Sequence, residues 1–414
     1  MAQPRSWSAA TAGFHGRAVT SHFDAIVVGA GIAGASTAWF LLAEGLRVAL
    51  VDTHAPGGGA SGRNPGFLWL QTKAAGLSMA LSLRARSFAE DFARDMGDAS
   101  FRSCGGLILY RDPACKPVAQ AFVVDRQAAG LPVSLLDRAE VANLVPEIGP
   151  EVSGAVWNPL DAHQNTSAFI VHLGQAFVAA GGTLMSGARV VSLDVTGSRC
   201  RGVTLACGRR LQAAQVVLAT GPFCNDLLRP HGVTVPFSPV RLEAAATAPA
   251  PFRLGPVLAG QALFRFFVPP GVDSNLVPVD PTAQLWPDLG FTEQMASLPD
   301  GSILFGCAYQ VGDSGDQATV AGQAIAISTL CRNVPALARL PLQRVWAGSV
   351  ALTADSLPVV DPDCGVDCLA LNLGHWYGNL AGALSGRMLT EAIMGRTGDP
   401  HLAALSRQRL LPAV

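Results

Sequence analysis

The sequence predicts an α/β protein: a mostly parallel sheet with helices, joined to a second, α+β domain built on an antiparallel sheet. Residues 24–28 and 47–51 each have one charged residue followed by four apolar ones and flank a helical segment, 32–44, which is the pattern of a buried β-α-β unit. A third apolar segment, 215–219, again runs into glycine. Between about 235 and 340 the prolines cluster and short segments alternate, as at 262–268 and 302–308, which favours antiparallel strands.

The remaining elements follow from periodicity and stop signals. Helical spacing of apolar residues predicts helices at 74–96, ended by Gly97, and at 166–180, ended by two glycines. A strand is expected at 106–110, and Asp137 is a candidate N-cap for the segment 135–144. The final predicted elements are a hairpin formed by 190–195 and 201–206, a strand at 368–373, and a helix at 381–394 after a glycine turn.

Composition excludes several classes of protein. The chain has 414 residues, of which 50% are hydrophobic and 14% charged, with a formal net charge of -1. Such a chain is globular, long enough for two or three domains, and has no basic surface for nucleic acid. Lys73 and Lys116 are its only lysines, so a polybasic membrane patch is absent. The nine scattered cysteines form no CxxC pair, which predicts reduced, mostly buried thiols in a cytoplasmic protein and no metal site.

Two segments raise the question of targeting. Residues 25–43 are 19 in a row without a charge, long enough for a membrane span, but their glycines have nucleotide-loop spacing. We therefore expect a buried β-α unit and no integral span. Residues 1–22 have no acid and no apolar signal core, which predicts a disordered tail. A tag remnant or a weak organellar transit peptide stays open for this segment.

Gly29, Gly31 and Gly34 fit the GxGxxG fingerprint for dinucleotides. The first glycine makes the turn, the second admits a pyrophosphate, and the third lets the helix pack on the strand. The helix amino terminus then faces the phosphates. Asp52, at the end of the next strand, is expected to accept hydrogen bonds from ribose hydroxyls, which disfavours a 2′-phosphate and hence NADP.

Three further motifs follow in order. They are the glycine loop GGGASGRNPG at 57–66, VLATG at 217–221, and a carboxyl-terminal pair, WAGSVALTADSLPVV at 346–360 and LGHWYGNL at 373–380. Together with GxGxxG these motifs resemble the FAD-dependent amino-acid and amine oxidoreductases, which include D-amino-acid dehydrogenases, glycine oxidase and sarcosine oxidase. The resemblance spans residues 24–395 and implies FAD rather than NAD.

The resemblance implies a discontinuous, Rossmann-like FAD-binding domain made of residues 23–98, 150–232 and 340–398. Residues 99–149 and 233–339 would then form the substrate domain. It also implies a set of FAD-binding residues, with those from 374 to 380 near the pyrimidine side and the ribityl chain. The implied set is Gly29, Gly31, Ile32, Ala33, Gly34, Asp52, Thr53, Ala60, Ser61, Arg63, Asn64, Gly66, Val190, Ala219, Thr220, Gly221, Gly348, Gly374, His375, Gly378, Asn379 and Leu380.

The chain departs from the family's pattern at the substrate site. The motif W-x-G-x-R-P carries an arginine that would hold the substrate carboxylate, and this chain has Val350 there. Either another arginine, with Arg241 and Arg265 as candidates, takes that role, or the substrate is not a simple free α-amino acid. Gly348 stands where covalent-flavin members have a cysteine, so FAD is expected to be noncovalent. Leu304 roughly replaces the oxygen-activating lysine, which favours a dehydrogenase or a poor oxidase.

The implied activity is oxidation of the C–N bond of an amine or amino acid. Hydride would pass from the α-carbon of the deprotonated amine to flavin N5, leaving an imine that hydrolyses. His375 and Tyr377 are the candidate catalytic residues, and Gln71 and Trp376 are candidates for the pocket lining. Two alternatives stay open: oxidation of the C–OH bond of a 2-hydroxy acid, and a flavoprotein without amine-oxidising activity. The electron acceptor, whether oxygen, a quinone or a carrier, is not specified by the sequence.

Overall fold

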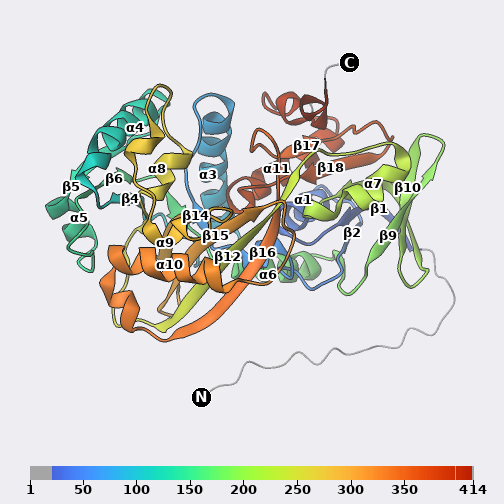
Figure 1. Cartoon of the computed structure of the whole chain (residues 1–414). Helices are drawn as coiled ribbons and strands as arrows, with labels where there is room; N and C mark the ends of the chain where they lie inside the picture. The colour runs from blue at the N-terminus through green and yellow to red at the C-terminus, as the bar shows by residue number, and fades with distance from the viewer. Residues whose placement is uncertain (1–20, 397, 413–414) are drawn as a thin grey trace.

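The computed structural model describes residues 21–396 and 398–412, so the predicted tail lies outside the described chain except for residues 21 and 22, which begin strand β1. A first sheet has the order β17-β18-β11-β1-β2-β8, with the hairpin β9-β10 attached to β11 (Figure 1). The central pairs are parallel, and β17 and the hairpin pair antiparallel. Its strands are β1 (Ser21–Val28), β2 (Val48–Val51), β8 (Thr183–Met185), β9 (Val190–Thr196), β10 (Arg199–Leu205), β11 (Arg210–Leu218), β17 (Val359–Asp361) and β18 (Leu369–Leu373).

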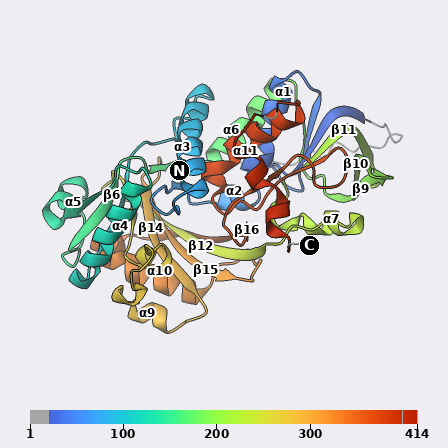
Figure 2. The ribbon, with the colours of Figure 1, turned by 90° about the horizontal axis from the view of Figure 1, so that it is seen from above.

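Strand β1 is continuously apolar from residue 25 to residue 28 because both of its faces are buried there. Ala25 and Val27 belong to a core shared with the helices, whereas Ile26 and Val28 face a second core with the hairpin. Helices α1 (Ile32–Ala43) and α11 (Gly378–Ile393) pack together, with α3 (Leu77–Asp95) against α11 and α6 (Thr166–Ala179) against α1 (Figure 2). The uncharged segment 25–43 is thus a strand and a helix of this domain, as predicted. No helix among the described residues is long and apolar enough to cross a membrane.

A second sheet has the order β16-β12-β15-β14-β13-β4-β6-β5, antiparallel except for the pair β13-β4. Figure 2 shows helices α4, α5, α9 and α10 with this part of the molecule. The strands are β4 (Gly106–Tyr110), β5 (Ser134–Asp137), β6 (Gly154–Asn158), β12 (Ser238–Pro249), β13 (Val257–Ala259), β14 (Gly290–Ser297), β15 (Ser302–Val311) and β16 (Leu342–Leu352). The helices are α4 (Lys116–Ala128), α5 (Arg138–Leu144), α8 (Ala262–Phe266), α9 (Pro281–Gln284) and α10 (Val320–Asn333).

Short elements join the two parts. They are α2 (Ala60–Arg63), α7 (Asn225–Leu228), and the strand pair β3 (Phe67–Leu68) and β7 (Ala162–His163). Asp137 caps α5 with a capping box, as the sequence indicates. The described chain has nine free cysteines, of which five are buried.

Two sequence expectations need correction. Segment 262–268 was expected to be extended, but α8 occupies 262–266, because Leu263 and Phe264 are buried and Phe264 packs edge-on against Phe122 of α4. The domain division stays a proposal, but strands β6 and β16, which the boundaries at 150 and 340 gave to the FAD-binding domain, pair in the second sheet. Both strands begin just after the proposed boundaries, so boundaries placed by motif do not coincide with the division between the two sheets.

Candidate flavin and substrate site

The GxGxxG turn has the geometry that its glycines predict. Gly29 has φ +106°, and a Cβ there would lie 2.3 Å from the carbonyl oxygen of Ala219, at the end of β11. A Cβ on Gly34 would lie 1.8 Å from the carbonyl oxygen of Gly29, so the turn closes on the helix. A Cβ on Gly31 would come within 3.0 Å of Ser61 Oγ. The three glycines therefore bring β1, β11 and α2 together around the amino terminus of α1.

Asp52 ends β2 beside this turn. Its Oδ2 accepts a hydrogen bond from the backbone nitrogen of Ala30 at 2.6 Å, and its Oδ1 accepts one from the backbone nitrogen of His54 at 2.7 Å. A carboxylate has about four acceptor sites, so two remain for a ligand hydroxyl. Thr53 is exposed next to it. Asp52 therefore lies beside the glycine turn with acceptor capacity left, and its role as a ribose ligand stays a proposal.

The glycine loop at 57–66 folds into α2 and is locked to β16. Trp346 Nε1 donates a hydrogen bond to the carbonyl oxygen of Arg63 at 2.9 Å, and Arg63 donates back to the carbonyl oxygen of Ala347 at 3.3 Å. Ser61 Oγ accepts from the backbone nitrogen of Ile32 at 3.1 Å, which ties α2 to the start of α1. Gly348 faces Arg63, whose Cβ would lie 3.1 Å from an added Cβ. The motif W-x-G thus holds the loop over the dinucleotide turn.

The carboxyl-terminal motif reaches the same place. Asn379 Nδ2 donates to the carbonyl oxygen of Phe67 at 2.5 Å, which fixes the first turn of α11 to β3. His375 Nε2 contacts Asn372 Oδ1 at 2.7 Å, whereas its Nδ1 is buried without a hydrogen-bond partner in the described structure. Burial lowers the pKa of His375 to about 4, so the imidazole is neutral at physiological pH. Leu380 is buried behind this turn.

These segments line one cleft, which gathers most of the residues expected to bind the cofactor. Its lining comprises Gly31, Ile32, Ala33, Ala60, Ser61, Asn64, Ala219, Gly221, Pro222, Ser349, Val350, Ala351, Asn372, Leu373, Gly374, His375, Trp376, Gly378 and Asn379. Among them, His375 Nδ1 and Ser349 Oγ are buried polar atoms without a partner, and so is Oγ1 of the adjacent Thr220. Orphaned polar atoms beside a glycine cradle fit a bound dinucleotide that supplies the missing hydrogen bonds.

The predicted substrate residues are distributed differently. Val350 and Trp376 line the cleft, and Tyr377 lies between Trp376 and Gly378. Gln71 is fully buried and donates to Asp161 Oδ2 at 2.6 Å, while its Oε1 has no partner. Val190 lies on the hairpin strand β9 and is not part of the lining.

The structure does not bring the two candidate arginines to the cleft. Arg241 is 4% exposed and its guanidinium is committed to Glu243, to Asp313 Oδ2 at 2.8 Å and to Gln310 Oε1 at 2.8 Å. Arg265 donates to the carbonyl oxygen of Val277 at 2.6 Å and so holds the loop after α8. Neither residue lines the cleft, so the structure does not place either guanidinium there as a carboxylate anchor.

Sequence reasoning missed two buried groups next to the predicted site. Asp161 accepts hydrogen bonds from the backbone nitrogen of Leu70 at 2.7 Å and from Asn158 Nδ2 at 2.8 Å, in addition to Gln71. Burial raises the pKa of Asp161 to about 7. Lys73 is 3% exposed and lies against the ring of Tyr377. The only signal in the sequence was that Lys73 follows closely after the apolar run 67–70 behind the glycine loop, and an exposed lysine is the usual expectation.

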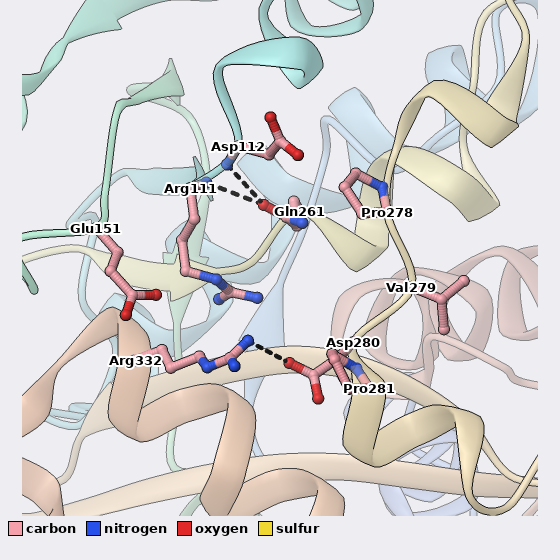
Figure 3. A pocket seen from close by; sticks show the side chains of 9 residues that line it. All are labelled: Arg111, Asp112, Glu151, Gln261, Pro278, Val279, Asp280, Pro281 and Arg332. Carbon is pink, nitrogen blue, oxygen red and sulfur yellow. Dashed lines mark hydrogen bonds and ion pairs between the residues drawn. The ribbon is translucent and has the colours of Figure 1, made fainter.

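A second cavity lies on the other domain (Figure 3). Gln261 Oε1 accepts from the backbone nitrogen of Arg111 at 2.9 Å at one side, and Arg332 pairs with Asp280 at 3.0 Å at the other. Arg111 is also paired, with Glu293 at 3.0 Å. This cavity shares no lining residue with the cleft, and its two arginines are already neutralised. No group of three or more potential metal ligands occurs in the described part of the chain.

Comparisons with known proteins agree with this geometry. An opine oxidase subunit of Rhizobium meliloti is 24% identical over 351 residues, covering 82% of this chain and 84% of that protein. The crystal structure of glycine oxidase from Bacillus cereus superposes with a TM-score of 0.80 at 18% identity, covering 95% of this chain and 99% of the other. L-proline dehydrogenase from P. horikoshii gives 0.79 at 20% identity, covering 94% and 98%. At these identities the two structures establish the fold alone.

The family assignment rests on a match along most of the chain. The model of the DAO family, described as FAD dependent oxidoreductase, matches residues 24–392, which includes all four motifs that meet at the cleft. The chain belongs to the FAD-dependent oxidoreductases of the DAO family.

Proposed function

We propose that this enzyme oxidises the C–N bond of an amine or amino acid to an imine, which then hydrolyses. The observation that supports the proposal is that motifs far apart in the sequence meet at one cleft. Gly31 and Asn379 both line it, although more than 300 residues separate them in the chain. The similar glycine oxidase and L-proline dehydrogenase act on amino acids by name. Bound FAD would supply the two-electron chemistry by accepting hydride.

The protein's own contribution is position, water exclusion and charge. Gly31, Ser61 and Asp52 would hold the pyrophosphate and ribose, and the amino-terminal turn of α11 would lie near the flavin ring. His375 stays neutral because burial lowers its pKa to about 4. Its unpartnered Nδ1 can therefore form a hydrogen bond with the cofactor without adding charge to the site. Trp376 and Val350 would wall the substrate side with apolar surface. Such a dry site strengthens each polar contact to a bound substrate.

The test is anaerobic reduction of the holoenzyme by a substrate panel. Amines, amino acids and 2-hydroxy acids are added one at a time, and bleaching of the flavin absorbance is followed. Reduction by amines or amino acids with release of ammonia and a carbonyl product supports the proposal. Reduction by 2-hydroxy acids alone would establish C–OH oxidation instead. A flavin that dithionite reduces but no member of the panel bleaches would indicate a flavoprotein without this activity.

We also infer that FAD is held noncovalently. Gly348 offers no thiol at the position where covalent members have cysteine, and no histidine occurs in the loop 57–72. Acid or heat denaturation should therefore release all of the flavin into the supernatant. Flavin fluorescence that stays with the polypeptide on a denaturing gel would contradict this.

A further inference from the structure

The cleft has little charge of its own with which to recognise a substrate carboxylate. Among the described residues that line it there is no lysine, arginine, aspartate or glutamate. Val350 is apolar, Arg241 is paired with Glu243 and Asp313, and Arg265 does not line the cleft. A carboxylate brought into such a site without a cationic partner would be strongly disfavoured. A cation, if one serves the site, has to come from a neighbouring element.

Lys73 supplies a basic side chain from such an element. Its side chain is 3% exposed, and its Nζ lies 2.7 Å from the centroid of the Tyr377 ring. Tyr377 directly precedes α11 and stands between Trp376 and Gly378, both of which line the cleft. Lys73 therefore packs against a residue whose two sequence neighbours line the cleft.

The ammonium of Lys73 is under-satisfied. It has three N–H donors, and it makes one hydrogen bond, to Thr72 Oγ1 at 3.2 Å, and no ion pair within the described residues. Burial lowers the pKa of Lys73 well below its usual value, and the negative charge of Asp161 opposes this effect. Asp161 makes no ion pair with Lys73 among the described residues, and its carboxylate accepts hydrogen bonds from Leu70, Gln71 and Asn158 instead.

The segment that carries Lys73 is also held firmly. Arg126 Nε donates to the carbonyl oxygen of Gln71 at 2.7 Å, and Trp69 Nε1 donates to Gln294 Oε1 at 2.8 Å. These bonds join the segment 69–73 to α4 and to β14 of the second sheet. An unpaired, buried ammonium on a fixed segment is a costly feature that a negatively charged ligand would relieve.

We propose that Lys73 binds the carboxylate of the substrate, in place of the arginine that the family's motif has at the position of Val350. The inference rests on the proposed function and names its substrate class: amines that carry a carboxylate. A carboxylate beside Nζ fills donors that the protein leaves open and pairs two charges away from water. Because an ammonium is a compact charge with rotating donors, it holds a carboxylate through one oxygen, without the planar fork that arginine offers.

The test measures binding, without turnover. Holoenzyme is titrated with benzoate and with benzamide, a neutral analogue of nearly the same shape, and the perturbation of the flavin absorbance gives each Kd. Wild type should bind benzoate at least tenfold more tightly than benzamide. Lys73→Met should lose at least tenfold in benzoate affinity, and Lys73→Arg, which keeps the charge, should lose much less. The matched control is Lys116→Met, since Lys116 is the only other lysine and is exposed on α4.

The outcomes separate this inference from the proposed function. Equal affinity of wild type for benzoate and benzamide overturns the assignment of Lys73, whether or not the variants fold. Unchanged benzoate binding in Lys73→Met overturns it as well. If Lys73→Met does not retain FAD, Lys73→Gln is compared with Lys73→Arg. Equal benzoate affinity in these two variants would show that the positive charge at position 73 does not bind the carboxylate, and would overturn the assignment. Failure of the whole substrate panel to reduce the flavin bears on the proposed function and leaves the benzoate result intact.

Discussion

At the scale of single residues, the cleft depends on a few groups that have more than one partner. Asp52 links the glycine turn to the end of β2 through the backbone nitrogens of Ala30 and His54, and the same carboxylate is the expected ribose ligand. His375, which lines the cleft, has one ring nitrogen bonded within the protein, while the other is buried without a hydrogen-bond partner in the described structure. Such residues shape the site in the absence of ligand and complete their hydrogen bonds when it binds.

Asp52→Asn should weaken FAD binding while the fold is retained. The amide keeps the shape and one acceptor oxygen, but it loses the charge-assisted hydrogen bonds to the ribose, which contribute about 1.5–3 kcal/mol. FAD added to apoprotein and followed by fluorescence quenching gives the dissociation constant. Asp24→Asn, within the neighbouring strand β1 and away from the glycine turn, is the control and should bind FAD like wild type. An unchanged constant in Asp52→Asn would show that this side chain does not face the ribose.

Val350→Arg should add a second way to hold a carboxylate. Val350 lines the cleft from β16, so an arginine there could pair bidentately with a small α-amino acid. The ratio of kcat/KM for alanine to that for ethylamine should rise at least tenfold. In the Lys73→Met background the same change should restore benzoate affinity. A ratio that does not move would mean that position 350 does not meet the substrate.

At the scale of elements, local patterns predicted the parts whose environment is set by near neighbours. The β-α-β unit around Gly29 was predictable because a strand buried on both faces is apolar throughout and its glycines have fixed spacing. The helix α8 was not predictable in this way. Every residue of 262–268 except Arg265 is apolar, and so short an apolar run is compatible with the periodicity of a helix and with that of a strand. Contact with Phe122, 142 residues away in the sequence, decides it.

The candidate site was predictable to the same extent. The residues 374–379 follow from motif, but the availability of a charged side chain depends on partners distant in sequence. Arg241 looked free in sequence, and it is neutralised by Asp313 from the loop after β15. Lys73 looked like a surface residue, and it is buried because Tyr377, about 300 positions later, covers it.

Gly29→Ala should abolish FAD binding and destabilise the first sheet. The added Cβ would lie 2.3 Å from the carbonyl oxygen of Ala219, so β1 and β11 would have to move apart at the dinucleotide turn. Gly45→Ala is a matched control: Gly45 also has positive φ, +83°, but an added Cβ there meets nothing within 4 Å. Both substitutions carry the conformational cost of about 1–2 kcal/mol for a left-handed alanine, and only Gly29→Ala adds the clash. Thermal unfolding and FAD content of the purified variants should differ accordingly, and equal losses in both variants would contradict this account.

At the scale of the whole molecule, the two sheets meet around groups that are buried and titratable. His163, on β7, is 1% exposed, with Nε2 3.0 Å from the carbonyl oxygen of Pro65 in the glycine loop. Two residues away, Asp161 supports the segment that carries Lys73. Protonation or deprotonation of His163 and Asp161 therefore changes the stability of this junction, and hence of the whole fold.

The two groups have opposite effects on stability as the pH changes. Burial lowers the pKa of His163 to about 4 from 6.5, so between these values the unfolded chain binds a proton that the folded protein refuses. Its contribution makes the protein less stable as the pH falls through that window, with a slope of at most about 1.4 kcal/mol per pH unit. Burial raises the pKa of Asp161 to about 7 from 3.8, so its contribution makes the protein more stable as the pH falls from 7 towards 4. The wild-type profile alone mixes the two.

A substitution at His163 separates them. His163→Asn removes the titrating ring and keeps a donor for the Pro65 carbonyl oxygen, so its Tm relative to wild type should rise steadily as the pH falls from 6.5 to 4. Thermal scans of both proteins across this range give the difference directly, and the Asp161 contribution cancels because both proteins retain that residue. His22→Asn, at an exposed histidine at the start of β1, is the control and should run parallel to wild type. A Tm difference for His163→Asn that stays constant with pH would mean that water or a rearranged Pro65 loop lets the buried imidazole accept its proton in the folded state.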